Sequence, residues 1–139
     1  MRWSRLRQLI DNIIAPDLAL EFRCTRYRRP SGPEFGRYCV ILNGETVWAE
    51  PSDLHEEMKG SEVNAVASEI TAAIREYLDT PREELMTKKL EGDRWGLGDI
   101  LRSSDRRLGV RSLEKLSERE LCSAARKILS ERLGRRENC

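Results

Sequence analysis

Cysteine and histidine are the residue types that most readily hold a transition metal or act as nucleophiles. The 139-residue chain has four Cys and one His. Cys24, Cys39, Cys122 and His55 are candidates for a zinc site, but no C-x-x-C or H-x-x-x-H spacing brings any two of them together along the chain. We therefore predict no metal site. In a reducing compartment these thiols are expected to pack as small apolar side chains.

Sequence motifs for nucleophilic or nucleotide chemistry are missing. The chain has no G-x-S-x-G elbow and no P-loop, and Gly96-Leu97-Gly98 lacks the third glycine and the preceding strand of a dinucleotide-binding fingerprint. The single histidine, His55, lies among acidic residues and is predicted to be a solvated surface residue. The sequence therefore predicts no catalytic residue and no cofactor.

One remote alternative is a metal-dependent nuclease. Pro16-Asp17 and Glu57-Met58-Lys59 are similar to the PD and E-x-K elements in which carboxylates hold Mg²⁺ and a lysine steadies the attacked phosphate. In such enzymes the E-x-K element lies on a core strand. Here it lies between polar residues and Gly60, which favours a loop or the start of a helix.

Arginine-rich groups suggest a second alternative, nucleic-acid binding. One group surrounds Arg26 and Arg28, with Tyr27 and Tyr38 as stacking faces, and the other contains Arg106 and Arg107. The isoelectric point of about 7.7 lacks the basic excess of a dedicated nucleic-acid domain. The competing interpretation pairs these arginines with the acidic middle of the chain, and makes Asp105 a helix-end acceptor for one of them.

Hydrophobic periodicity defines the elements that must position these residues. A 3.6-residue period over residues 3–14 predicts a helix that Pro16 ends. From Leu18 the period becomes two, which predicts strands over residues 20–25, 37–42 and 45–49. Asn43-Gly44 between the last two strands predicts a type I′ hairpin turn.

Counting outward from that turn gives a register for the predicted three-stranded antiparallel sheet. Its pairs are Ile41 with Thr46, Val40 with Val47, Cys39 with Trp48, Phe22 with Ile41, and Cys24 with Cys39. In this register one sheet face carries the helices, and the second face presents apolar and aromatic side chains to a partner. The residues of that second face are Tyr27, Tyr38, Val40, Leu42, Val47 and Ala49.

The helical period returns after Ser52. Ser61 is predicted to cap a helix that runs to Leu78, and Thr80 to cap a short helix before Gly92. A further helix over residues 99–108 is expected to stop at Gly109, and a capping box at residues 117–120 to start a last helix that ends before Gly134. The predicted fold is one α+β domain, residues 1–139 with a frayed tail over 134–139, in which one helix precedes the sheet and three to five helices follow it on one face.

Three short motifs carry a resemblance. Met1-Arg2-Trp3-Ser4 with Leu6, Thr25-Arg26-Tyr27-Arg28, and Asp105-Arg106-Arg107-Leu108-Gly109 before a short Leu-rich helix resemble a family of small bacterial proteins of no assigned function. The resemblance implies a free-standing bacterial cytosolic protein whose domain starts at Met1. It implies no activity, ligand or catalytic residue.

The function that follows is a noncatalytic protein-binding or self-associating module. No stretch approaches the roughly 18 consecutive apolar residues of a membrane span, and the N-terminus lacks the apolar core of a signal peptide, so a cytoplasmic location is expected. The expected partner is another protein or a second copy, bound through Tyr27, Tyr38, Val40 and Val47. Nucleic acid bound through Arg26, Arg28, Arg106 and Arg107 is the alternative.

Overall fold

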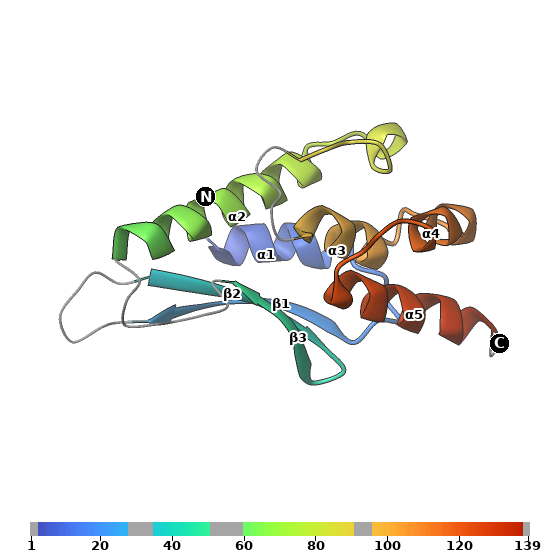
Figure 1. The fold of residues 1–139 in the computed structure, drawn as a ribbon, viewed down its shortest axis with the longest axis horizontal. Helices are drawn as coiled ribbons and strands as arrows, with labels where there is room; N and C mark the ends of the chain where they lie inside the picture. Colours follow the sequence, from blue (N-terminus) through green and yellow to red (C-terminus); the bar gives the residue numbers. More distant parts are fainter. Residues whose placement is uncertain (1–2, 28–34, 51–59, 91–95, 138–139) are drawn as a thin grey trace.

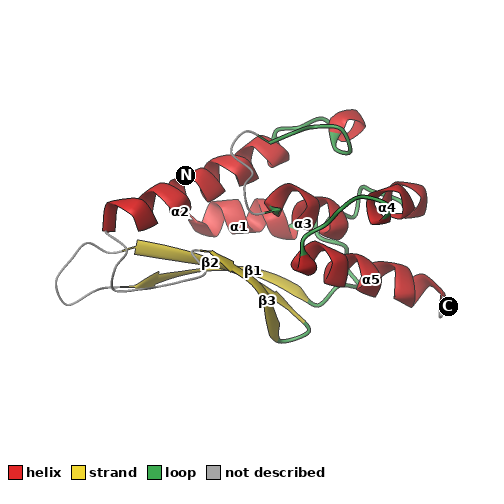
Figure 2. Cartoon of the chain, viewed as in Figure 1, coloured by secondary structure: helices red, strands yellow, loops and turns green. Residues whose placement is uncertain are grey.

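The computed structural model describes residues 3–27, 35–50, 60–90 and 96–137. Within these ranges a helix is followed by a three-stranded antiparallel sheet and then by four α-helices, which confirms the predicted α+β class (Figures 1 and 2). The elements are α1 (Trp3–Asp11), β1 (Leu20–Tyr27), β2 (Phe35–Leu42), β3 (Glu45–Glu50), α2 (Gly60–Leu78), the 3-10 turn η1 (Arg82–Glu84), α3 (Leu97–Ser104), α4 (Val110–Ser117) and α5 (Ser123–Glu137).

The strands lie in the order β1-β2-β3, so that β2 is the central strand. Asn43 and Gly44 both have positive φ, 53° and 81°, as a type I′ turn requires. The turn predicted between β2 and β3 is therefore confirmed. Next to it, Ile41 lies opposite Thr46 as predicted.

The rest of the predicted register is wrong by one residue. Phe22 lies opposite Val40, and Cys24 lies opposite Tyr38 and not opposite Cys39. Across the hairpin, a bulge between Val40 and Ile41 shifts the pairing. The resulting pairs are Val40 with Trp48 and Cys39 with Ala49. Because successive side chains of a strand point to opposite faces, a slip of one residue exchanges the faces of β1 relative to β2, so that Phe22 and Cys24 join the face that carries Tyr38 and Val40.

The exchange places the predicted binding face inside the core. Tyr38, Val40 and Leu42 are buried, and Val40 is 0% exposed. Helices α2 and α1 lie on this face over β2 and β1 (Figure 1). Trp3 of α1 meets the Tyr38 ring edge to face at 5.2 Å, and the Tyr38 hydroxyl is hydrogen-bonded to Thr71 of α2. The prediction that Tyr38 and Val40 lie on an open face is therefore wrong, and Val47 is only partly buried against the same core.

Helix α1 ends at Asp11, before the predicted end at residue 14. The chain beyond it pairs with the end of α3: the Ala15 amide donates to the Ser104 carbonyl at 2.8 Å, and the Arg106 amide donates to the Ile13 carbonyl at 2.7 Å. These bonds need extended backbone around Ile14, which bridges Asp105. A long-range pairing thus replaces the last helical turn.

Two predicted helix caps act as helix ends. The Thr80 hydroxyl donates to the Glu76 carbonyl at 2.7 Å, so it closes α2 and starts no helix beyond the three-residue turn η1. The Ser117 hydroxyl donates to the Glu114 carbonyl, and Ser117 is the last residue of α4. Both hydroxyls satisfy carbonyls of the preceding helix, which a local motif does not reveal.

Gly109 also differs from its predicted role. Its φ is −85°, so it is not a left-handed stop but the residue before α4. The helix α3 ends earlier, at Ser104, where Asp105 becomes extended. The last helix, α5, begins at Ser123 and continues past Gly134 to Glu137.

Candidate functional site

Arg107 of the second arginine group belongs to a structural cluster at the end of α3. Asp105 is 0% exposed and accepts hydrogen bonds from the Tyr77 hydroxyl at 2.6 Å and from the Arg107 Nη2 at 2.7 Å. Burial raises the pKa of the Tyr77 hydroxyl, and the charge of Asp105 raises it further. The bond to Asp105 raises the pKa of the Arg107 guanidinium. Asp105 therefore acts as the helix-end acceptor that the sequence predicts, and Arg107 has a structural role as its ion-pair partner.

A buried arginine that sequence reasoning missed completes the cluster. Arg132 of α5 donates to the carbonyls of Ser103 at 3.0 Å, Asp105 at 2.8 Å and Leu108 at 3.2 Å. These carbonyls lie at the end of α3, where helical partners are missing. The available signal was spacing, since Arg132 lies four residues after Ile128 and three after Leu129, on the buried stripe of α5.

The other predicted nucleic-acid residues are only partly described. Arg106 is exposed, and Arg26 and Tyr27 lie in β1 opposite Gly36 and Phe35. The side chains of Arg26 and Tyr27, and the whole of Arg28, lie outside the described residues. The described geometry therefore leaves a joint arginine surface untested.

The candidate metal and nuclease residues are also only partly described. Asp17 is exposed, whereas His55 and residues 57–59 lie outside the described ranges. Within those ranges no group of three metal-ligating side chains occurs. Cys24 and Cys39, which were predicted to be neighbours across the strands, lie on opposite faces of the sheet.

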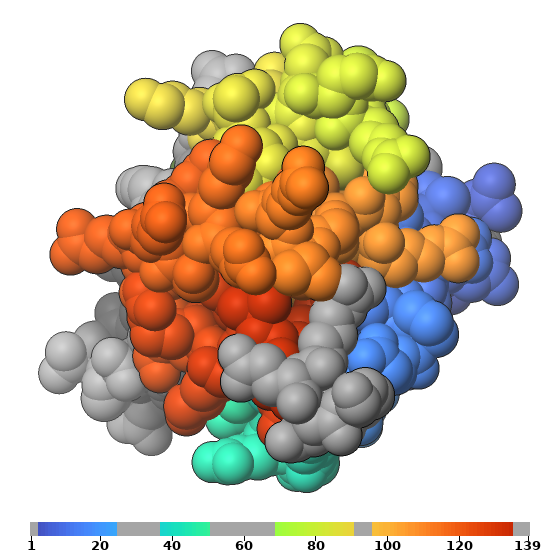
Figure 3. All heavy atoms as spheres, turned by 90° about the vertical axis from the view of Figure 1, so that its right-hand side faces the viewer, coloured from blue at the N-terminus to red at the C-terminus, as the bar shows by residue number. Residues whose placement is uncertain are grey.

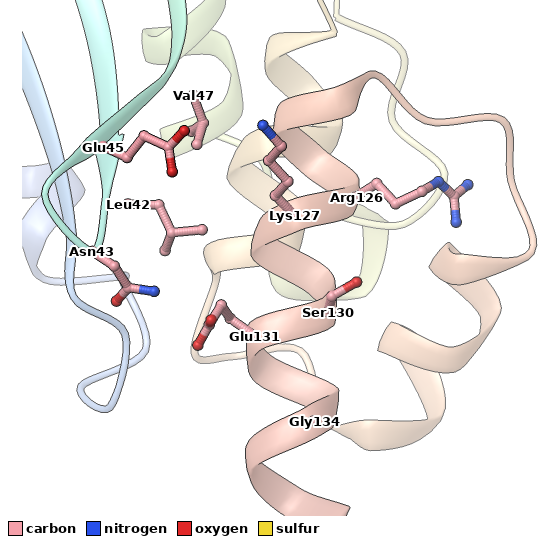
Figure 4. A pocket seen from close by; sticks show the side chains of 9 residues that line it. All are labelled: Leu42, Asn43, Glu45, Val47, Arg126, Lys127, Ser130, Glu131 and Gly134. Atoms are coloured by element: carbon pink, nitrogen blue, oxygen red, sulfur yellow. The ribbon is translucent and has the colours of Figure 1, made fainter.

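A groove separates the β2–β3 hairpin from α5 (Figure 4). Its volume is about 510 Å³, and Leu42 and Val47 form part of the hairpin wall. Lys127 extends toward the hairpin, whereas Arg126 turns away from it and donates to the Arg119 carbonyl at 2.9 Å. Ser130 is the only hydroxyl among the nine lining residues, and none of the nine is a histidine that could activate it.

The outer edge of β1 is the most regular pairing surface that the described residues offer. Strand β1 is hydrogen-bonded to β2 alone. The Asn43 amide donates to the Ala19 carbonyl at 2.9 Å, so the odd-numbered residues that continue from Ala19 along β1 turn their backbone groups toward β2. The backbone groups of Leu20 and Phe22 consequently point to the outer edge.

The two edges of the sheet differ in how they are protected. The pairing of β1 runs through eight residues with neither a proline nor a bulge. Strand β3 carries the register shift, and α5 packs beside it. Bulges and prolines are common devices that keep edge strands from pairing with other chains, and β1 has neither within its paired length. Helix α1 packs on β1, as α5 packs on β3.

Opposite charges alternate with apolar residues along this edge. Glu21 and Arg23 lie on the face away from the helices, on either side of the buried Phe22. Arg23 Nη2 lies 3.0 Å from Glu21 Oε2, and Arg7 Nη2 of α1 donates to Glu21 Oε1 at 3.1 Å. The edge therefore presents one acid and one base two residues apart.

The fold and this edge define a small α+β protein whose three-stranded sheet is covered by helices on one face, and whose first strand pairs, among the described residues, with β2 alone. Residues 48–133, which are more than half of the 139, match the SF0329 protein family, and the chain belongs to that family. The match runs from β3 into α5, and the family's name states no activity. Searches of curated proteins and of solved structures gave no match. None of the described helices is long and apolar enough to cross a membrane.

Proposed function

We propose that this protein is a noncatalytic self-associating module in which β1 of one copy pairs antiparallel with β1 of a second copy. The observation that carries the proposal is the outer edge of β1, which has neither a proline nor a bulge and carries the opposite charges of Glu21 and Arg23 two residues apart. The product is a continuous six-stranded sheet with a twofold axis, the commonest symmetry of homo-oligomers. The predicted association through Val40 and Tyr38 is replaced, because those residues are buried.

Charge selects one register for this pairing. Outward-pointing groups meet when even-numbered residues of the two copies lie opposite one another. With Phe22 on the twofold axis, Glu21 of each copy lies opposite Arg23 of the other, in the closely spaced positions where side chains interact most strongly. If the twofold axis is moved by one residue along β1, it falls on Glu21 or on Arg23. The two copies then place two Glu21 or two Arg23 side chains opposite each other.

The ion pair between Arg7 and Glu21 is too weak to prevent this pairing of strands. The side chain of Arg7 is 41% exposed and that of Glu21 is 33% exposed, so their contact is a surface ion pair. Such pairs contribute about 0–1 kcal/mol. Replacing the Arg7 contact of Glu21 by a contact with Arg23 of a second copy therefore costs little free energy. The new strand pair also gains backbone hydrogen bonds.

A bacterial origin and a cytoplasmic location complete the proposal. The origin rests on the resemblance that the motifs beginning at Met1 and at Asp105 carry. The location agrees with Cys39 and Cys122 being free thiols. The noncatalytic character is supported by the cluster around Asp105, whose perturbed groups Tyr77 and Arg107 are bonded to a buried structural carboxylate.

The proposal is tested by exchanging the charges of Glu21 and Arg23. The dissociation constant of the dimer is measured by analytical ultracentrifugation over a range of protein concentrations. We expect the native protein to form a dimer, and Glu21→Arg and Arg23→Glu each to raise the dissociation constant about tenfold, because each substitution places like charges opposite one another twice. The double exchange restores opposite charges and is expected to restore the dimer. Glu45→Arg, at an exposed position of β3, is the matched control.

Two results would overturn the proposal. One is a native protein that stays monomeric at millimolar concentration. The other is a double exchange that is as weak as the single variants although circular dichroism shows native folding. The nucleic-acid alternative stays a prediction, since Arg107 is bonded to Asp105 and no described contact favours it over self-association.

A further inference from the structure

A pocket of about 600 Å³ is lined by the segment that follows η1, by α3 and by Arg119, which lies two residues beyond the end of α4. Figure 3 shows this segment, in yellow, directly against the orange residues that include α3 and α4. Four cationic side chains line the pocket, those of Lys88, Lys89, Arg102 and Arg119, against one carboxylate, that of Asp99. All of these residues belong to the part of the chain that matches the family.

Arg102 fixes the geometry of the pocket. Its side chain is 7% exposed, and its Nε donates to the Leu85 carbonyl at 2.6 Å while Nη2 donates to the Lys88 carbonyl. Its Nη1 donates to Asp99 Oδ1 at 2.9 Å. The same guanidinium therefore holds the backbone that carries the two lysines and neutralises Asp99, the one carboxylate among the described lining residues.

The remaining cations keep most of their charge for a ligand. Arg119 Nη2 donates to the Met86 carbonyl at 2.6 Å, and Arg119 Nη1 lies 3.9 Å from the already paired Asp99. Lys88 Nζ lies 3.6 Å from Glu76, and Lys89 is exposed. Exposed lysine contacts of this kind are weak and exchange readily. Three cations thus surround a pocket whose carboxylate is held by Arg102.

The contrast with the groove beside α5 shows that this charge is particular to the pocket. That groove is lined by two acids, Glu45 and Glu131, and two bases, Arg126 and Lys127 (Figure 4). Its charges balance, whereas those of the pocket do not. A pocket of this size accepts a small organic molecule, and clustered Lys and Arg recognise phosphate.

We propose that this pocket binds a small molecule carrying more than one phosphate group, held by Lys88, Lys89 and Arg119. The inference is independent of the β1 dimer, because the pocket and β1 share no residue. Pyrophosphate is the probe, and isothermal titration at low ionic strength is the measurement. Inorganic phosphate should bind more weakly than pyrophosphate, since it reaches fewer of the cations.

The variant pair Lys88→Gln and Lys89→Gln tests the site without touching Arg102, which the fold needs. We expect the double variant to lower pyrophosphate affinity at least tenfold. The control is Lys115→Gln with Lys127→Gln, which removes two exposed lysines elsewhere and should leave the affinity within twofold. Raising the salt concentration should weaken binding to the native protein.

The proposal is overturned if pyrophosphate fails to bind at millimolar concentration, or if the control pair loses as much affinity as the pocket pair. A short single-stranded RNA is the third arm. If RNA binds more tightly than pyrophosphate and loses affinity in the pocket pair, the pocket serves a nucleic acid and the small-molecule assignment is wrong.

Discussion

The Tyr77 hydroxyl donates a 2.6 Å hydrogen bond to the carboxylate of Asp105, and this bond joins the end of α2 to the end of α3 inside the protein. Tyr77 is 0% exposed, as is Asp105. Arg107 balances the charge of the carboxylate, and Arg132 holds the Asp105 carbonyl. A buried carboxylate at this position is stable only while its donors are present.

Tyr77→Phe is expected to lower the free energy of unfolding by about 1–3 kcal/mol at neutral pH, because a buried carboxylate oxygen loses a donor. The pH dependence has a defined sign. The folded pKa of Tyr77 lies above its ordinary value, so the contribution of its hydroxyl is complete below about pH 10 and is lost as the pH rises further. Denaturant unfolding of the native protein between pH 8 and 11 measures this loss.

The phenylalanine variant serves as the control for this pH profile. Lysines and other tyrosines titrate in both proteins, so the difference between the two profiles isolates Tyr77. The native advantage should shrink by up to about 1.4 kcal/mol per pH unit above pH 10. An advantage that stays constant to pH 11 would show that Tyr77 ionises in the folded protein as it does in the unfolded chain.

Arg132→Met is expected to destabilise the protein by about 3–5 kcal/mol, since it leaves buried carbonyls at the end of α3 without donors. The matched control is Arg111→Met, which removes an exposed guanidinium from α4 and should change stability by less than about 0.5 kcal/mol. Equal melting temperatures for the two variants would refute the structural role of Arg132.

Gly96→Ala tests a backbone position that requires glycine. Gly96 has a φ of 75°, and a β-carbon there would lie 2.8 Å from the Cys122 Sγ. Left-handed strain and overpacking together are expected to cost about 2–5 kcal/mol. Cys122→Ala removes the sulfur, so the alanine at position 96 should cost less in that background.

Gly134→Ala is the matched control for this pair. Gly134 lies within α5, and a β-carbon there meets nothing within 4 Å. The substitution should stabilise the protein by about 0.5–1 kcal/mol, because alanine is the better helix former. If Gly96→Ala were as harmless as Gly134→Ala in chemical denaturation, the conformation of residue 96 would have to be revised.

Arg7→Ala should strengthen the β1 dimer about two- to fivefold, because it removes the ion pair that competes for Glu21. Arg5→Ala, which truncates an exposed arginine of the same helix, should leave the dissociation constant unchanged. Ultracentrifugation distinguishes the two. A weaker dimer in Arg7→Ala would mean that Arg7 supports the paired edge and does not compete with it.

Local sequence patterns determined the α+β class, with one helix before the three-stranded sheet and further helices after it. The change of period at Leu18 and the Asn43-Gly44 turn placed the sheet correctly, because side-chain periodicity and positive φ are properties of short segments. Local patterns also identified Asp105 as a helix-end acceptor, since its partner Arg107 lies only two residues away.

The tertiary structure decided which face of the sheet is buried. The register of β1 on β2 depends on how Phe22 and Val40 pack beneath α1 and α2, and the bulge beside Val40 has no sequence signal of its own. For the same reason Arg132, Thr80 and Ser117 took roles that nearby residues do not indicate: each of them satisfies carbonyl groups at the end of a helix. The carbonyls that Arg132 binds are buried and have no water to bind, so the folded chain, and not the local motif, selects their donor.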